Sequence, residues 1–233
     1  SRHLSCDRHG ARRTVFARFN GLRADPAEVL YRSHRRTACF AAHGQPRQAG
    51  ILYSGGNIPL NDWILTTDRI EGQRLTLIPL RAAYLRDYLN GFDAEAARYQ
   101  FAETFPHIRD AAEYFHDCYL REQARMGFVR LIVSKDGSFM GSVEAHGLWG
   151  QTVDLGLWLT TSCRGQGYGR EALLLLVEFL VQRGYHRFHY ETDMRNAASV
   201  RLIEGLNAQK IAHEDVCSKH GKQLYLDLYE LHR

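Results

Sequence analysis

Hydrophobic and polar positions alternate regularly from Arg74 onward, and this pattern predicts a succession of strands and helices. Residues 128–133 and 139–146 are predicted strands, and the Asp136-Gly137 pair between them is typical of a tight hairpin turn. Apolar residues that recur with a helical period predict a long helix over residues 170–183. The other predicted strands are 74–78, 152–159, 187–192, 209–216 and 223–231, and the other predicted helices are 80–89, 110–125 and 197–206. Strands and helices mixed in this order predict an α+β fold with helices on both faces of the sheet.

A glycine-rich turn separates the predicted strand 152–159 from the long helix, and it reads Arg164-Gly165-Gln166-Gly167-Tyr168-Gly169. Amides without a helical partner and the helix dipole attract anions at such a turn, and glycine permits positive φ and a close backbone approach. A P-loop is excluded because no Lys-Ser or Lys-Thr follows the glycines, and a dinucleotide loop is excluded because the glycines are spaced by two. The turn therefore predicts another class of phosphate or pyrophosphate site.

The spacing Arg164-x-x-Gly167-x-Gly169 resembles the coenzyme A loop of the GNAT N-acetyltransferases, whose pattern is Gln/Arg-x-x-Gly-x-Gly/Ala. Residues 196–204, N-A-A-S-V-R-L-I-E, are similar to the N-x-x-S-x-x-L-x-E helix of the branch that acetylates ribosomal-protein N-termini. The resemblance covers roughly residues 74–233. It implies that residues 61–233 form a GNAT domain with a mixed, mostly antiparallel sheet of about six to seven strands, and that acetyl-CoA is the co-substrate.

The resemblance also implies the cofactor-binding residues. The six residues of the glycine-rich turn would hold the pyrophosphate, and the backbone of Leu157, Trp158 and Leu159 would pair with the pantetheine arm, because this strand splays from its neighbour in the family. Asn196 and Ser199 would begin the next helix of the site. Many family members place a Tyr seven residues after this Asn, where the chain has Ile203, which cannot donate a proton. Ser199 can donate a hydrogen bond to the leaving thiolate instead, or it can simply pack or cap the helix beside the N-cap residue Asn196.

Direct attack of an amine on a thioester, without a covalent enzyme intermediate, requires a neutral amine. At pH 7 a Lys-type amine costs roughly 4–5 kcal/mol to neutralise, whereas a protein α-amine costs only about 1 kcal/mol. An α-amine acceptor therefore needs only a modest base. Glu144 and His146 share one face of their strand, and Asp154 and Glu191 are further candidates. We predict Glu144 as the base.

Two other functions remain open from the sequence. The acceptor can be a polyamine, an amino acid or an antibiotic rather than a protein N-terminus. The chain can also be a non-catalytic acyl-CoA sensor, in which Ile203 reflects lost chemistry. The expected partners are an amine acceptor and, as a further possibility, a second copy of the chain. Five cysteines at wide spacing, without a CxxC pair, predict neither a disulfide framework nor a metal site.

Charge is distributed unevenly along the chain. Residues 1–60 hold ten Arg, no Lys and three acidic residues, which is +7, whereas residues 61–233 hold twenty basic and twenty-three acidic residues, which is −3. Two explanations of residues 1–60 stay open: an arginine-rich arm that binds RNA or another polyanion, and an irregular, disordered or non-native extension, which we favour. The nearly neutral remainder argues against dedicated nucleic-acid binding. The sequence also lacks a bilayer-length apolar run and an apolar signal region, so we expect no membrane partner and a cytoplasmic location.

Overall fold

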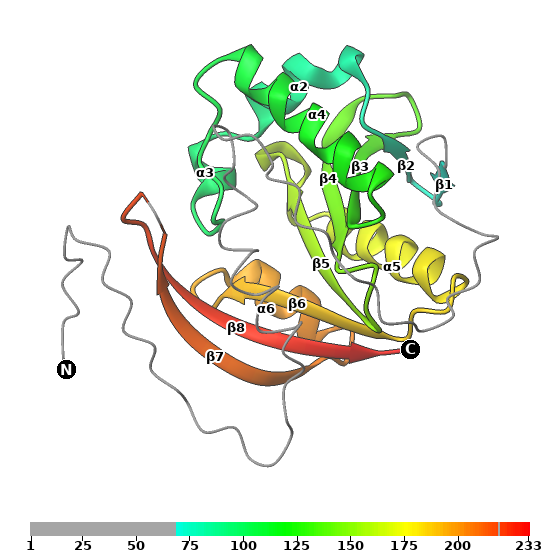
Figure 1. The fold of residues 1–233 in the computed structure, drawn as a ribbon, viewed down its shortest axis with the longest axis vertical. Helices are drawn as coiled ribbons and strands as arrows, with labels where there is room; N and C mark the ends of the chain where they lie inside the picture. The colour runs from blue at the N-terminus through cyan, green and yellow to red at the C-terminus, as the bar shows by residue number, and fades with distance from the viewer. Residues whose placement is uncertain (1–68, 219) are drawn as a thin grey trace.

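An eight-stranded sheet forms the centre of the computed structural model, which describes residues 69–218 and 220–233 (Figure 1). The strands are β1 Ile70–Glu71, β2 Leu75–Pro79, β3 Gly127–Ser134, β4 Phe139–His146, β5 Thr152–Leu159, β6 Arg187–Asp193, β7 Gln209–Cys217 and β8 Gln223–His232. Their order in the sheet is β1-β2-β3-β4-β5-β6-β8-β7. Every neighbouring pair is antiparallel except β5 and β6, which are parallel. The predicted mixed, mostly antiparallel sheet is confirmed.

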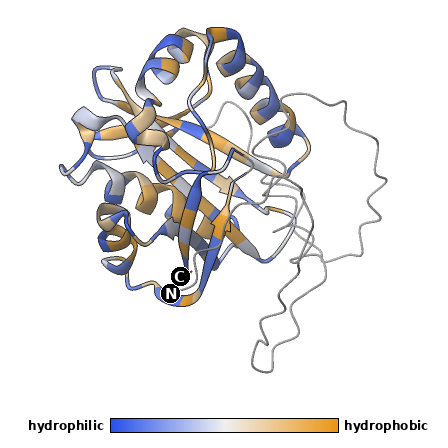
Figure 2. Cartoon of the chain, turned by 90° about the vertical axis from the view of Figure 1, so that its left-hand side faces the viewer, coloured by the Kyte–Doolittle hydropathy of each residue, from blue (hydrophilic) through white to orange (hydrophobic). Residues whose placement is uncertain are grey.

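Helices cover both faces of this sheet, as the sequence predicts. They are η1 Ala82–Tyr84, α2 Leu85–Gly91, α3 Ala94–Ala97, α4 Ile108–Gln123, η2 Thr161–Cys163, α5 Tyr168–Val181 and α6 Ala197–Glu204. The apolar side of α5 packs with α6 and with inward residues of β3, β4 and β5 in the larger core cluster. Tyr88 of α2 and Phe92, which follows that helix, pack with α3, α4 and the opposite face of the sheet in a second cluster. Figure 2 shows hydrophobic strands in the middle and helices that carry both hydrophobic and hydrophilic residues.

The hydrophobic pattern located most elements well, and the errors fall on short ones. Strands 139–146 and 152–159 match the structure at both ends. The two-residue β1 and the single turn of α3 were not predicted, because neither is long enough to show a period. The predicted helix 80–89 is wrong at its start, where a 3-10 turn precedes α2. The predicted extension, residues 1–60, and its boundary at residue 61 lie outside the described residues.

The only parallel pair of the described sheet separates after four residue pairs. Register runs from Thr152 opposite Arg187 to Leu155 opposite Tyr190, and no pairing follows. The partner on the other side, β4, stays paired with β5 as far as Leu159. Among the strands that the structure describes, the segment Gly156–Leu159 therefore pairs on one side only. We call this divergence of β5 from β6 the fork, and it is visible in Figure 1, where β5 runs away from β6 toward α2 and α4.

One side chain ties the tip of the β7–β8 hairpin to the segment around α3, which lie side by side in Figure 1. The ammonium of Lys222 donates to three backbone carbonyl oxygens at 3.0–3.1 Å, those of Ala97, Gln100 and Ala102. It also forms an ion pair with Glu103 at 3.0 Å. Lys222 is largely shielded from solvent, so these contacts hold the hairpin against the helical layer.

A helix that could span a membrane is not found among the residues that the structure describes.

Replacing Lys222 with Met is expected to destabilise the protein by about 1.5–3 kcal/mol, because hydrogen bonds from a charged donor to buried carbonyls are lost. Thermal unfolding measures the effect. The control is Lys135→Met, which removes an exposed ion pair with Glu71 and is expected to cost less than about 1 kcal/mol. Equal losses of stability in the two variants would contradict this account of the hairpin contact.

Candidate active site

The glycine-rich turn before α5 has the backbone shape of an anion cradle. Gly165 and Gly167 have φ values of 74° and 81°, a region that favours glycine, and Gly167 is the N-cap residue of α5. A Cβ at Gly169 would lie 3.1 Å from Leu202 of α6 and 3.2 Å from Leu157 of β5. The first turn of α5 therefore packs directly against the fork. The start of a helix presents amides without a helical partner, so a glycine-rich turn at this place fits a pyrophosphate.

Three side chains brace the turn. Arg164 donates from Nε to the backbone oxygen of Leu159 at 3.1 Å, and Gln166 donates from Nε2 to the backbone oxygen of Ser162 at 2.7 Å. The third is Arg74, at the start of β2. Its guanidinium donates to the backbone oxygen of Gln166 at 2.9 Å and lies 4.6 Å from the centre of the Tyr168 ring. The turn is thus held by the segment that precedes it and by Arg74, which lies next to β2.

Arg74 also fixes the first turn of α5 through Glu171. Its backbone N–H and its Nε each donate to one carboxylate oxygen of Glu171 at 2.7 Å. Burial raises the pKa of the Glu171 carboxyl, but the hydrogen bonds from Arg74 outweigh it, so the pKa is lowered from 4.5. Sequence reasoning assigned Arg74 to a strand and gave it no role. No local signal was available, because its partners lie 92 and 97 residues away.

On the α5 side of the sheet, the fork carries a pair of hydroxyl groups. Tyr190 is the last residue of β6 that pairs with β5, and its hydroxyl lies 2.9 Å from Oγ of Ser199. The backbone N–H of Ser199 donates to Oδ1 of Asn196 at 3.3 Å. Asn196 is therefore the N-cap of α6, and Ser199 stands in the first turn with its hydroxyl directed at β6. Ile203 is fully buried in the larger core cluster.

On the opposite face, Glu144 stands beside the fork. It lies across from Gly156, where a Cβ would come within 3.4 Å of the Glu144 Cβ. One carboxylate oxygen lies 2.8 Å from Nε2 of His146, and the other accepts from the hydroxyl of Tyr114 at 3.5 Å. Burial, together with the charges of Cys118 and Glu144, raises the pKa of Tyr114 well above 10.0, so this phenol stays a donor. A side chain at position 156 would contact the Glu144 side chain, and glycine avoids this contact.

The other two candidate bases are placed differently. Asp154 lies opposite His146 and His189, before the strands separate, and its Oδ1 is 3.8 Å from Nδ1 of His189. Nε2 of His189 lies 3.1 Å from Glu230, so Asp154 belongs to a charge network across the closed end of the fork. Glu191 is the first residue of β6 beyond the last pair. Because side chains alternate along a strand, Glu191 is on the same face as Glu144.

Aromatic residues of α2 and α4 pack above this face. Tyr88 lies at the centre of the group and contacts the ring of Trp158 edge-on at 5.1 Å between centroids. Phe105 and Tyr114 are partly buried in the same cluster, whereas Phe101 packs against the β7–β8 hairpin. Tyr119 is half exposed. Most aromatic side chains in this region are therefore structural, and Tyr114 is the one that reaches Glu144.

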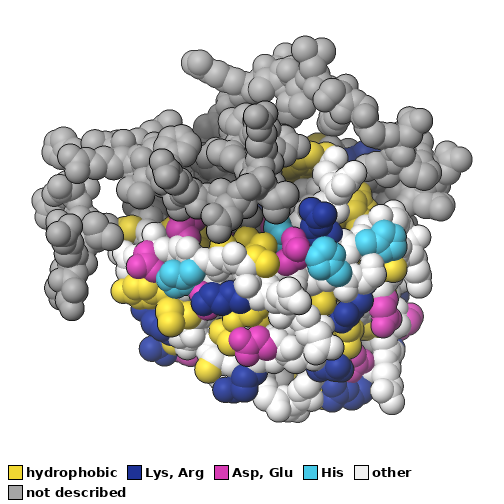
Figure 3. Space-filling view, turned by 90° about the horizontal axis from the view of Figure 1, so that it is seen from below, with side chains coloured by type: hydrophobic (Ala, Val, Ile, Leu, Met, Phe, Trp, Pro, Cys, Tyr) yellow, Lys and Arg dark blue, Asp and Glu magenta, His cyan; other side chains and the backbone are white. Residues whose placement is uncertain are grey.

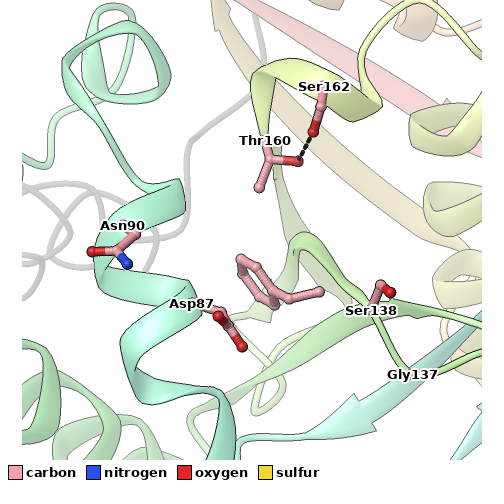
Figure 4. A pocket seen from close by; sticks show the side chains of 7 residues that line it. Asp87, Asn90, Gly137, Ser138, Thr160 and Ser162 are labelled. Atoms are coloured by element: carbon pink, nitrogen blue, oxygen red, sulfur yellow. Dashed lines mark hydrogen bonds between the residues drawn. The ribbon is translucent and has the colours of Figure 1, made fainter.

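Two other surface features carry polar and charged side chains. A shallow polar hollow of about 410 Å³ is lined by Asp87 and Asn90 of α2 and by Thr160 and Ser162 after β5 (Figure 4). On the face seen from below, basic, acidic and histidine side chains are interspersed among the described residues (Figure 3). Charged residues on β7 and β8 also pair with each other, as Lys210 does with Asp227 at 2.7 Å. Neither feature concentrates one sign of charge, so neither attracts a polyanion through its field.

Comparison with known proteins shows what this geometry is similar to. Residues 74–209, more than half of the chain, match the model of the acetyltransferase (GNAT) domain. No curated protein matches closely enough to establish a relationship.

Solved structures share the fold at low sequence identity. Mycobacterium smegmatis RimJ in complex with CoA-disulfide has a TM-score of 0.65 at 12% identity, over 71% of this chain and 88% of that one. An acetyltransferase from Salmonella typhimurium that modifies the N-terminal serine of the 50S subunit protein L7/L12 has a TM-score of 0.64 at 16% identity. The match covers 71% of this chain and 99% of that one. A GNAT acetyltransferase from Bacillus anthracis has a TM-score of 0.61 at 16% identity, over 71% of this chain and 98% of that one.

Replacing Arg74 with Met is expected to weaken coenzyme A binding about tenfold, because the turn loses both its brace and a nearby positive charge. Arg74→Lys keeps the charge without the forked geometry and should restore only part of the affinity. Calorimetric titration with coenzyme A measures both. Arg69→Met, which removes an exposed pairing with Glu71, is the matched control. Wild-type affinity in Arg74→Met would refute the role of this residue.

Proposed function

The chain belongs to the GNAT acetyltransferase family, and on that premise we propose that its acceptor is a protein N-terminal α-amine. The reaction itself follows from the family: the enzyme is an acyl-CoA-dependent N-acetyltransferase, and acetyl-CoA supplies the acetyl group.

The donor is proposed to bind along the fork on the α5 side. The amides of residues 165–169 would hold the pyrophosphate, with Arg164 and Gln166 keeping the turn in shape. Among the described strands, the backbone of Leu157, Trp158 and Leu159 has no partner on the β6 side, and apart from the Leu159 oxygen held by Arg164 we propose that its polar groups pair with the pantetheine arm. The same backbone can donate to the thioester oxygen as negative charge develops there. Asn196 and Ser199 would border the reacting end of the donor.

Glu144 is proposed as the general base. The observation that carries this proposal is the division of the fork between two faces: Glu144 lies on one side of β5, and the hydroxyl of Ser199 lies on the other. An amine that arrives from the α2–α4 side can lose its proton to Glu144 while it attacks a thioester held on the α5 side. His146 and Tyr114 each contact one oxygen of Glu144, which orients the carboxylate.

A protein α-amine fits this site better than a lysine-type amine. At pH 7 the α-amine needs only about 1 kcal/mol to become neutral, and a single carboxylate can supply this. Glu144 and Glu191 stand on the same face at the fork, where two carboxylates favour the approach of an ammonium group. The fold neighbour from Salmonella typhimurium modifies an N-terminal serine, which supports the same acceptor class. Small-molecule amines, a homodimer and a polyanion partner for residues 1–60 stay predictions of the sequence.

The direct test follows release of free coenzyme A from acetyl-CoA against N-terminal peptides, polyamines and aminoglycosides. Preferential turnover of peptides with a free N-terminus, lost when that terminus is blocked, is the expected result. Turnover of a polyamine or an aminoglycoside alone would replace the proposed acceptor class. Tight binding of acetyl-CoA without turnover of any amine would favour the sensor function.

Replacing Glu144 with Gln is expected to lower kcat about 100-fold or more with the best acceptor, because the general base is lost. Affinity for coenzyme A should change by less than about twofold, since the donor binds on the other face. The matched control is Glu113→Gln, on the exposed surface of α4. A Glu144→Gln enzyme with wild-type kcat would exclude Glu144 as the base.

A further inference from the structure

We propose that Tyr190 is a positioning residue for departure of the thiolate: it holds Ser199 so that the serine hydroxyl hydrogen is directed at the sulfur. The inference rests on the proposed role of Ser199 and deepens it. Through Ser199, a tyrosine on β6 would supply the hydrogen-bonding capacity that Ile203 of α6 cannot supply.

The placement of Tyr190 carries this inference. Tyr190 is opposite Leu155 in the last pair before β5 and β6 separate, so it stands at the closed end of the fork. Its side chain is 5% exposed and belongs to the core cluster on the α5 side. From there its hydroxyl reaches Oγ of Ser199 at 2.9 Å, in the first turn of α6. A buried, packed ring is a rigid support, whereas a lone serine hydroxyl rotates freely.

The direction of this hydrogen bond decides its value for catalysis. A tyrosine hydroxyl has one proton, and a serine oxygen can accept one hydrogen bond while its own hydrogen points elsewhere. If Tyr190 donates to Ser199, the serine hydrogen is free to face the sulfur. If Ser199 donates to Tyr190, the serine hydrogen points at the tyrosine oxygen and the sulfur has no donor from this pair. Negative charge on sulfur selects the first arrangement, because only that arrangement gives the thiolate a donor.

Burial raises the pKa of Tyr190 above 10.0, although its hydrogen bond with Ser199 acts in the opposite direction. The phenol therefore remains protonated at neutral pH and keeps its donor. Burial also means that a proton is not passed from Tyr190 to the thiolate, because a buried phenolate would be left behind. The pair acts through hydrogen bonds, and Tyr190 does not change its protonation state.

The reaction then balances without a further reactant. The amine nitrogen forms a bond to the carbonyl carbon and loses its proton to Glu144. The C–S bond breaks, and its electron pair leaves on sulfur as coenzyme A thiolate. Ser199 donates a hydrogen bond to that sulfur, and Tyr190 donates to Ser199. The thiolate takes a proton from water after release, and Glu144 returns its proton to solvent.

The first experiment titrates the thiol of bound coenzyme A by its ultraviolet thiolate absorbance and needs no acceptor. We expect Tyr190→Phe and Ser199→Ala each to raise the pKa of the bound thiol by about one unit relative to wild type. The control is Tyr185→Phe, which removes another buried hydroxyl of the same core cluster, one that donates to the Leu148 backbone oxygen at 2.7 Å. This control should leave the pKa of the bound thiol unchanged even if it lowers thermal stability.

The second experiment measures kcat with whichever amine turns over fastest. Tyr190→Phe should lower kcat about tenfold with little change in the KM for acetyl-CoA, and the double variant with Ser199→Ala should lose little more, because the two residues act as a unit. A wild-type thiol pKa and kcat in Tyr190→Phe would overturn the proposal. Failure of all peptide acceptors would instead refute the proposed acceptor, since the thiol titration is independent of it.

Discussion

The separation of β5 from β6 is the constraint on which the rest of the site depends. A strand inside a sheet normally satisfies its backbone on both sides, because unpaired buried amides and carbonyls are costly. Here Gly156–Leu159 keeps one neighbour, β4, and gives up the other. Such a segment is stable only where another partner can satisfy its backbone. The pantetheine arm proposed to lie there is an extended chain with amides of its own, so it can serve as that partner in the way a peptide adds to a sheet edge.

The same separation assigns different chemistry to the two faces of the sheet. Successive residues of a strand point to opposite faces, so the fork presents Leu155 and Leu157 on the α5 side and Gly156 and Trp158 on the other. Glycine at position 156 avoids a contact that any larger residue would make with the Glu144 side chain. Proton removal and thiolate departure can therefore occur on opposite sides of a single strand. Neither the proton nor the thiolate has to cross the sheet, and donor and acceptor can bind without competing for space.

Rigidity around the fork comes from contacts between distant segments. Arg74 joins the start of β2 to the turn before α5, and Lys222 joins the β7–β8 hairpin to the segment around α3. Both side chains donate to backbone carbonyls, which fixes the main chain itself rather than another flexible side chain. The core beneath is continuous from α5 through the strands to α6. Loops that carry the site are thus held by the scaffold at several points.

The sequence by itself determined the α+β class, most strands and long helices, and the glycine-rich turn with its position between β5 and α5. These are local features: alternation, helical period and glycine spacing are all read within a few residues. Only the tertiary structure decided that β5 and β6 diverge after Leu155 and Tyr190, that Arg74 braces the turn, and that Tyr190 meets Ser199. These contacts depend on strand register and helix packing, which join residues far apart in the chain. Hydrophobic periodicity indicates which face of an element a residue occupies, but it does not indicate which distant residue it contacts on that face.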